Sequence, residues 1–176
     1  MRAVVLYESM YGNTHQVATA IGDGLREGFD EVQVVPAGDA GAERVGGADL
    51  LVVGGPTHAH SISRASTRHQ AVEDARNPDH DLEVDPDAEG PGIRDWIATA
   101  PATGRFAAFD TRVDLPVLLS GRASKAISRK LRHHGLAEVV DPESFLVTKD
   151  SELEPGETDR ARDWGRQIAK RLAAVS

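Results

Sequence analysis

Short runs of apolar residues alternate along the chain with segments in which apolar residues recur every three or four positions. Residues 3–7 form a continuous apolar run, which predicts a buried strand. Val17, Ile21 and Leu25 then recur at spacings of four between polar residues, and this spacing predicts an amphipathic helix that ends at Gly28. Strand and helix together make the first of several similar units.

The same alternation continues to the end of the chain. Further strands are predicted at residues 32–35, 48–53, 105–109, 138–140 and 144–148, and helices at 64–76, around 93–97, at 123–134 and from 158 onward. Trp96 and Trp164 fall on apolar helix faces, which places them in the core. The pattern predicts an α/β fold with a doubly wound parallel sheet of five strands, whose ligand site lies beyond the carboxyl ends of the strands.

A polar stretch at about residues 77–92 interrupts the alternation, and we expect it to be a surface excursion from a single domain spanning residues 1–176. Its acidic residues could dock a basic redox partner or bind calcium: Asp79, Asp81, Glu83, Asp85, Asp87 and Glu89. Their spacing lacks the glycine and final glutamate of an EF-hand loop, which favours a solvated loop over a calcium site.

Composition limits the possible partners and the possible chemistry. The formal net charge is -8, which repels nucleic-acid backbones over most of the surface, so no nucleic-acid partner is expected. The chain has no cysteine, and redox chemistry would therefore need a bound cofactor. The apolar run at the N-terminus is too short for a signal peptide or a membrane span, so we expect a cytoplasmic location.

The segment that follows the first strand carries the clearest chemical signal. It comprises Ser9, Met10, Tyr11, Gly12, Asn13 and Thr14. Because it opens the first helix, its backbone amides and the positive end of the helix dipole favour an anion, and the hydroxyls of Ser9 and Thr14 can donate further hydrogen bonds. The segment lacks the glycine-rich dinucleotide pattern and the Gly-Lys-Ser/Thr ending of nucleotide-triphosphate loops. A terminal monophosphate fits best, although a simple capped turn is the alternative.

The pattern Ser9, Gly12, Thr14 after an apolar strand resembles the first loop of the flavodoxin family. This resemblance implies the strand order 2-1-3-4-5 and a non-covalently bound FMN whose phosphate lies in the first loop. It also implies that two further loops enclose the flavin ring. One contains Pro56, Thr57, His58, Ala59 and His60, and the other contains Phe109, Asp110, Thr111 and Arg112.

Two departures from the flavodoxin pattern concern the flavin ring. The loop after the third strand offers His58 and His60 where many electron-carrying flavodoxins place a Tyr or Trp, and Tyr11 replaces a small or hydroxyl residue. Less aromatic cover leaves the ring more open to a substrate. A His-x-His pair without a third ligand is weak evidence for a metal, so we predict no metal site.

The helix at residues 123–134 is basic on an otherwise acidic protein. Its region contains Arg122, Lys125, Arg129, Lys130 and Arg132, followed by His133 and His134. A nicotinamide dinucleotide phosphate or an acidic partner could dock there, but a solvated helix face beside inward-facing Ile127 and Leu131 is the simpler interpretation.

The resemblance implies an FMN-binding electron-transfer protein that shuttles electrons between a reductase and an acceptor. The partner would be a redox protein or a small-molecule electron acceptor, and no catalytic acid or base is needed. One alternative is an FMN-dependent oxidoreductase of the same fold, of the NAD(P)H:quinone reductase or protoporphyrinogen oxidase type. A second alternative is a non-redox interaction module that has lost the flavin.

Overall fold

The structure is a computed structural model that describes residues 1–58, 61–77, 82–101 and 104–174. Its strands are β1 (Arg2–Tyr7), β2 (Glu31–Pro36), β3 (Leu50–His58), β4 (Ser61–Ile62), β5 (Arg105–Val113), β6 (Ala137–Glu138) and β7 (Glu143–Val147). Its helices are α1 (Asn13–Leu25), α2 (Ala42–Val45), α3 (Ala65–Ala75), α4 (Ile93–Ile97), α5 (Val117–Ser120), α6 (Ala123–His133) and α7 (Glu157–Ala173), with a short 3-10 turn at Ala37–Asp39.

The strands form one sheet with the order β2-β1-β3-β5-β6, and these neighbours pair in parallel. β7 also pairs in parallel with β5, so β6 and β7 share the position of a single fifth strand. The predicted order 2-1-3-4-5 is therefore confirmed, with β5 as the fourth strand. The predicted count of five was too low, because the fifth strand is divided and β4 adds an antiparallel pair to the end of β3.

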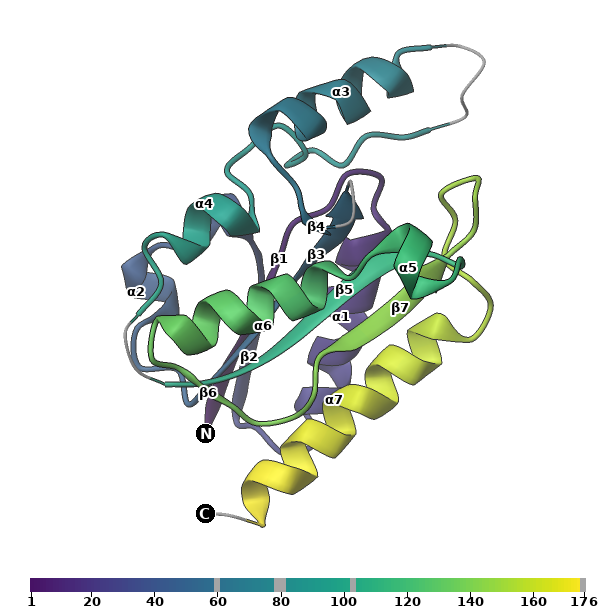
Figure 1. The fold of residues 1–176 in the computed structure, drawn as a ribbon. Coiled ribbons are helices and arrows are strands. Elements are labelled where there is room, and N and C mark those ends of the chain that lie inside the picture. The colour runs from purple at the N-terminus through teal and green to yellow at the C-terminus, as the bar shows by residue number, and fades with distance from the viewer. Residues whose placement is uncertain (59–60, 78–81, 102–103, 175–176) are drawn as a thin grey trace.

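Alternate residues of each central strand enter two separate cores, because successive side chains of a strand point to opposite faces of the sheet. Val5 and Val52 pack beneath α1 and α7, whereas Leu6 and Val53 pack beneath α4 and α6. Both faces are covered, which explains why these strands are continuous apolar runs. Figure 1 shows the two helical layers, with both chain termini at the end opposite α3.

α1 and α7 touch through their backbones at two glycines. A Cβ on Gly165 would lie 2.3 Å from the carbonyl oxygen of Ile21, and one on Gly24 would lie 2.0 Å from that of Arg162. A side chain at either position would push the helices apart. This close contact fixes the position of α1 beside α7. The N-terminus of α1 then faces the carboxyl ends of the strands.

The predicted helices and the core positions of both tryptophans are present in the structure. Trp96 and Trp164 are buried, and the indole of Trp96 donates a hydrogen bond to the carbonyl oxygen of Ala40 at 2.9 Å. The main differences are at strand ends, since β3 and β5 continue to His58 and Val113, several residues beyond their predicted ends.

Candidate functional site at the carboxyl ends of the strands

The loop at residues 8–12 connects β1 to α1 and takes its shape from Gly12. Gly12 has a φ of 83°, a left-handed conformation that other residues adopt only with strain, although a Cβ there would contact nothing within 4 Å. Its amide donates to Ser9 Oγ at 3.1 Å. α1 has no acidic residue in its first turn, so its first amides and its positive dipole end face the loop without a neutralising carboxylate from that turn.

Side chains at the start of α1 connect the loop to other strands. Thr14 Oγ1 lies 2.7 Å from Thr111 Oγ1 at the end of β5, and both side chains are buried. Asn13 Nδ2 donates to the carbonyl oxygen of Ser151, which follows β7. Ser151 itself has a positive φ of 60°. These bonds hold the first loop against the strand ends.

A cavity of about 160 Å³ opens where the loop meets the ends of β3, β5 and β7. Nine of the predicted site residues line it, namely Met10, Tyr11, Asn13, Thr14, Pro56, Thr57, His58, Thr111 and Arg112. Pockets for drug-sized ligands usually measure about 300–1,000 Å³. This cavity can therefore enclose only part of a flavin nucleotide, and the rest would lie in the open mouth.

Ser9, Gly12, Phe109 and Asp110 are predicted site residues that do not line this cavity. Ser9 and Gly12 shape the loop behind it, as described above. Phe109 is fully buried in the core, where its ring packs edge-on against Trp164 at 6.5 Å. Ala59 and His60 lie outside the described residues.

Asp110 is fully buried and supports the neighbouring helix. Its Oδ2 accepts a hydrogen bond from the amide of Ser124, at the start of α6, at 2.6 Å. Burial raises its pKa above the ordinary value of 3.8, and the hydrogen bonds from Ser124 and Ser144 oppose that rise. Thr57 acts similarly, because its Oγ1 accepts from the amide of Ala123 at 2.9 Å. Both residues hold the N-terminus of α6 beside the cavity.

His58 lies next to a buried polar cluster that the sequence did not reveal. Glu8 accepts from Ser63 Oγ and from the amide of Ile93, the latter at 2.8 Å. Arg68 donates from Nη1 to Ser63 Oγ at 3.2 Å, and its Nη2 forms an ion pair with Asp95 at 2.8 Å. Burial holds the pKa of His58 below its ordinary value of 6.5, Arg68 adds to that effect, and Glu8 opposes it. The imidazole is therefore neutral near pH 7.

The polar excursion is attached to the first loop. The amide of Asp85 donates to the carbonyl oxygen of Met10 at 2.7 Å, and its buried carboxylate lies 3.5 Å from His15 Nδ1. Tyr11 Oη donates to the carbonyl oxygen of Ala71 in α3 at 2.9 Å. The sequence favours a solvated position for Asp85, like that of the other acids of the excursion. The structure shows that it anchors the excursion to the loop.

Three residues that the sequence did not indicate also line the cavity. Val113 extends β5 by one position beyond the predicted segment, and Val147 and Ser151 come from the end of β7 and the turn after it. Val147 and Ser151 could have been predicted, because ligands lie at the carboxyl ends of parallel strands and β7 is also a parallel strand of this sheet.

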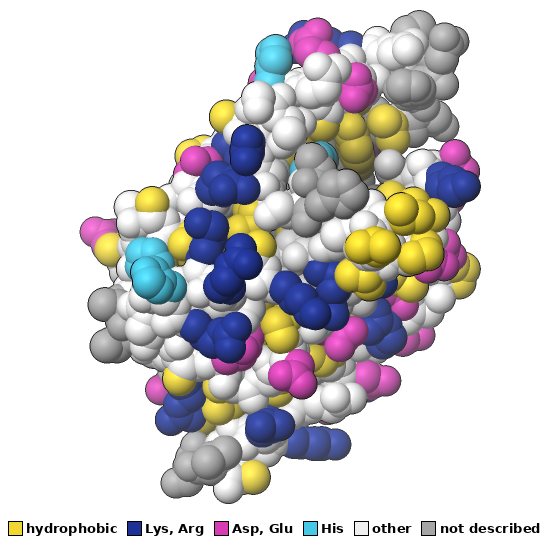
Figure 2. Space-filling view, in the orientation of Figure 1, with side chains coloured by type: hydrophobic (Ala, Val, Ile, Leu, Met, Phe, Trp, Pro, Cys, Tyr) yellow, Lys and Arg dark blue, Asp and Glu magenta, His cyan; other side chains and the backbone are white. Residues whose placement is uncertain are grey.

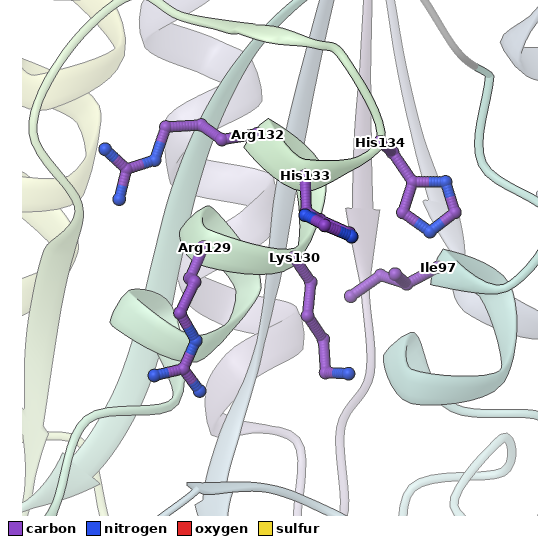
Figure 3. Close-up of a pocket in the computed structure, with 6 residues that line it drawn as sticks. All are labelled: Ile97, Arg129, Lys130, Arg132, His133 and His134. Atoms are coloured by element: carbon purple, nitrogen blue, oxygen red, sulfur yellow. The ribbon is translucent and has the colours of Figure 1, made fainter.

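A larger hollow of about 600 Å³ lies away from the strand ends, between α4 and the end of α6. It is lined by Ile97, Arg129, Lys130, Arg132, His133 and His134, and Figure 3 shows their side chains. No group of three or more His, Asp or Glu side chains suited to a metal ion occurs within the described ranges. No helix among the described residues is long and apolar enough to cross a membrane.

Comparison with known proteins agrees with this architecture. A family model described as flavodoxin matches residues 5–86, which contain the first loop and the end of β3. The structure of a flavodoxin from the domain Archaea is similar at a TM-score of 0.66 and 22% identity, covering 98% of this chain and 99% of that one. The chain has a flavodoxin-like fold.

Other solved structures share this flavodoxin-like fold. Flavodoxin 1 from Bacillus cereus has a TM-score of 0.64 at 19% identity, covering 97% of this chain and 98% of that one. A WrbA-like flavodoxin from Agrobacterium tumefaciens has a TM-score of 0.61 at 19% identity, covering 98% of each chain. No curated protein sequence matches the chain. The predicted flavodoxin resemblance is confirmed, and FMN is the cofactor of that family.

The cavity offers donors of the kind that an anionic flavin nucleotide needs. Besides the start of α1, the cavity is lined by Arg112, whose buried Nε has no hydrogen-bond partner among the described residues. A buried donor without a partner is costly unless a ligand or water satisfies it. The positive charge of Arg112 and the open start of α1 suit a negatively charged flavin nucleotide such as FMN.

Proposed function

We propose that this flavodoxin-like protein binds FMN non-covalently in the cavity and transfers electrons through it, from a reductase to a protein or small-molecule acceptor. The observation that carries the proposal is the meeting of the anion-favouring start of α1 with the ends of β3 and β5 around one cavity. FMN supplies one- and two-electron chemistry when bound. We further propose that the protein works in the cytoplasm.

Within this proposal the first loop holds the phosphate. The amides of Asn13 and Thr14 and the Thr14 hydroxyl lie at the N-terminus of α1, where negative charge is stabilised. No lysine or arginine of the loop is needed, since the loop itself contains none.

The ends of β3 and β5 would flank the ring. Pro56 and His58 line the cavity from one side, and Thr111 and Arg112 line it from the other. Tyr11 supplies an aromatic ring from the first loop, and its hydroxyl is tied to α3. This cover is thinner than two stacked aromatic rings, which leaves room for a small acceptor at the mouth.

Reconstitution with FMN tests the proposal. We expect the purified protein to bind FMN with a visible flavin spectrum and to bind riboflavin far more weakly, because riboflavin lacks the phosphate that the first loop would hold. Equal affinities, measured by fluorescence titration of the apoprotein, would refute the phosphate site. Tighter binding of FAD would point to a dinucleotide site.

The reduction behaviour separates the related functions. A carrier should show no flavin reduction by NAD(P)H under anaerobic conditions until a reductase is added. Direct reduction by NAD(P)H would indicate an oxidoreductase of the same fold. Absence of any flavin binding would indicate an interaction module.

A further inference from the structure

Apolar side chains protrude from one short segment beside the cavity. Among the described residues, the exposed large hydrophobic side chains other than Met1 are Leu115, Val117, Leu118 and Leu119, and Leu118 is 90% exposed. They form the turn of α5 and its approach, which we call the apolar tip. Exposed apolar clusters of this kind mark interaction sites.

The apolar tip is fixed to the wall of the cavity. Arg112 Nη1 donates to the carbonyl oxygen of Leu115 at 2.8 Å and to Ser120 Oγ at 3.1 Å. The guanidinium thereby spans both ends of α5. Hydrogen bonds from Arg112, a residue of the candidate site, therefore hold the tip in place.

The helix that follows the tip is strongly basic. Residues 115–137 contain five lysines and arginines and no acidic residue, although the chain as a whole carries -8. Lys125, Arg129 and Arg132 are exposed and recur at spacings of four and three, so they line one side of α6. Of the five cations, Arg132 alone forms an ion pair with a described residue, with Glu138 at 3.8 Å.

The apolar tip and the basic side of α6 lie on the same face. Figure 2 shows hydrophobic side chains gathered over α5 and dark blue side chains spread over α6 beside them. At the far end of α6, Arg129 and Arg132 line the hollow of about 600 Å³ together with Lys130, and these cations suit an anionic headgroup (Figure 3). The face thus combines a protruding apolar element with an extended positive surface.

We propose that this face, the apolar tip with the basic side of α6, binds the surface of an anionic phospholipid membrane. Protruding leucines can enter the boundary between headgroups and acyl chains without needing a shaped partner pocket, and cations spread along a helix match an extended sheet of negative charge. The acidic remainder of the molecule is repelled by the same surface, which orients the protein with this face toward the lipid. Because Arg112 lines the cavity and is hydrogen-bonded to both ends of the tip, docking brings the cavity mouth near the bilayer.

Vesicle co-sedimentation of the full chain, with and without FMN, tests this proposal separately from flavin binding. We expect binding to vesicles of 70% phosphatidylcholine and 30% phosphatidylglycerol, little binding to pure phosphatidylcholine, and weaker binding as salt rises. Free inorganic phosphate at millimolar concentration should not displace the protein. Failure to bind FMN would leave these expectations unchanged.

Matched variants assign the binding to this face. Lys125→Gln with Arg129→Gln should weaken partition into the anionic vesicles roughly thirtyfold, since each cation near such a surface contributes about 1 kcal/mol. Lys170→Gln with Arg171→Gln removes the same charge from the exposed last turn of α7 and should have little effect. Leu118→Ser should lower binding about tenfold while leaving the thermal unfolding temperature unchanged.

Three results would overturn the proposal. The first is no binding of the unmodified protein to anionic vesicles, which would leave the face to an acidic protein partner. The second is equal loss of binding in the α6 and α7 double variants, which would indicate a general charge effect. The third is unchanged binding in both the Leu118→Ser variant and the α6 double variant.

Discussion

A comparison of two single variants, Thr14→Val and Thr111→Val, tests whether the start of α1 contacts the FMN phosphate. The two hydroxyl oxygens lie 2.7 Å apart, and either can be the donor. Each hydroxyl carries one hydrogen, so the pair uses one hydrogen in its mutual bond and keeps one for another acceptor. If Thr111 donates to Thr14, the hydrogen of Thr14 remains for the phosphate at the helix start.

The two substitutions remove the same mutual hydrogen bond with nearly the same change of shape. Each should lower the free energy of unfolding of the apoprotein by about 1–2 kcal/mol, because the remaining buried hydroxyl loses its partner. Only Thr14→Val also removes a donor to a charged group, which is worth about 1.5–3 kcal/mol. The dissociation constant for FMN should therefore rise roughly ten- to a hundredfold in Thr14→Val and less than about threefold in Thr111→Val.

Urea denaturation of the two apoproteins checks the first expectation, and calorimetric titration with FMN checks the second. Riboflavin serves as the control ligand, since its affinity should not distinguish the two variants. Equal effects on FMN affinity would show that both substitutions act through the mutual hydrogen bond. An unchanged affinity in Thr14→Val would remove this hydroxyl from the phosphate site.

The sequence predicts the sheet order and the main helices because each central strand is buried on both faces. Residues 3–7 and 50–53 are apolar throughout and buried, and the spacing of Trp164, Ile168 and Leu172 shows the buried side of α7 directly. The position of the cavity follows from the same pattern, since ligands lie at the carboxyl ends of parallel strands.

The ends of the strands were harder to predict, and the site residues depend on them. The sequence predicts that β5 ends at Phe109, but the strand continues through Asp110, whose buried carboxylate accepts the amide of Ser124 at the start of α6. Phe109 thus points into the core instead of a loop. β3 likewise continues through Gly54, where a Cβ would lie 2.3 Å from the ring of Phe109. Both features depend on contacts between distant segments, which a local pattern does not contain.

Two further substitutions probe the surroundings of the site. His58→Gln should lessen the loss of stability on acidification. Burial lowers the pKa of His58 in the folded protein, so the unfolded chain takes up the proton first. The stability of the unsubstituted protein therefore falls as the pH drops below about 6.5. Urea midpoints measured between pH 7.5 and 5 check this, and identical slopes in the two proteins would contradict it. Gly165→Ala tests the backbone contact that positions α1. The added Cβ would lie 2.3 Å from the carbonyl oxygen of Ile21, so the helices must move apart by roughly 1 Å to reach an ordinary contact. Such overpacking costs about 1–3 kcal/mol, or more where the backbone must shift, and it outweighs the roughly 1 kcal/mol that alanine gains in a helix. The apoprotein should therefore unfold about 2–8 °C lower. Gly41→Ala is the matched control, since a Cβ there contacts nothing within 4 Å and its φ of -64° suits any residue. If Gly165→Ala were as stable as Gly41→Ala, the backbone contact between α1 and α7 would not constrain how closely the two helices pack.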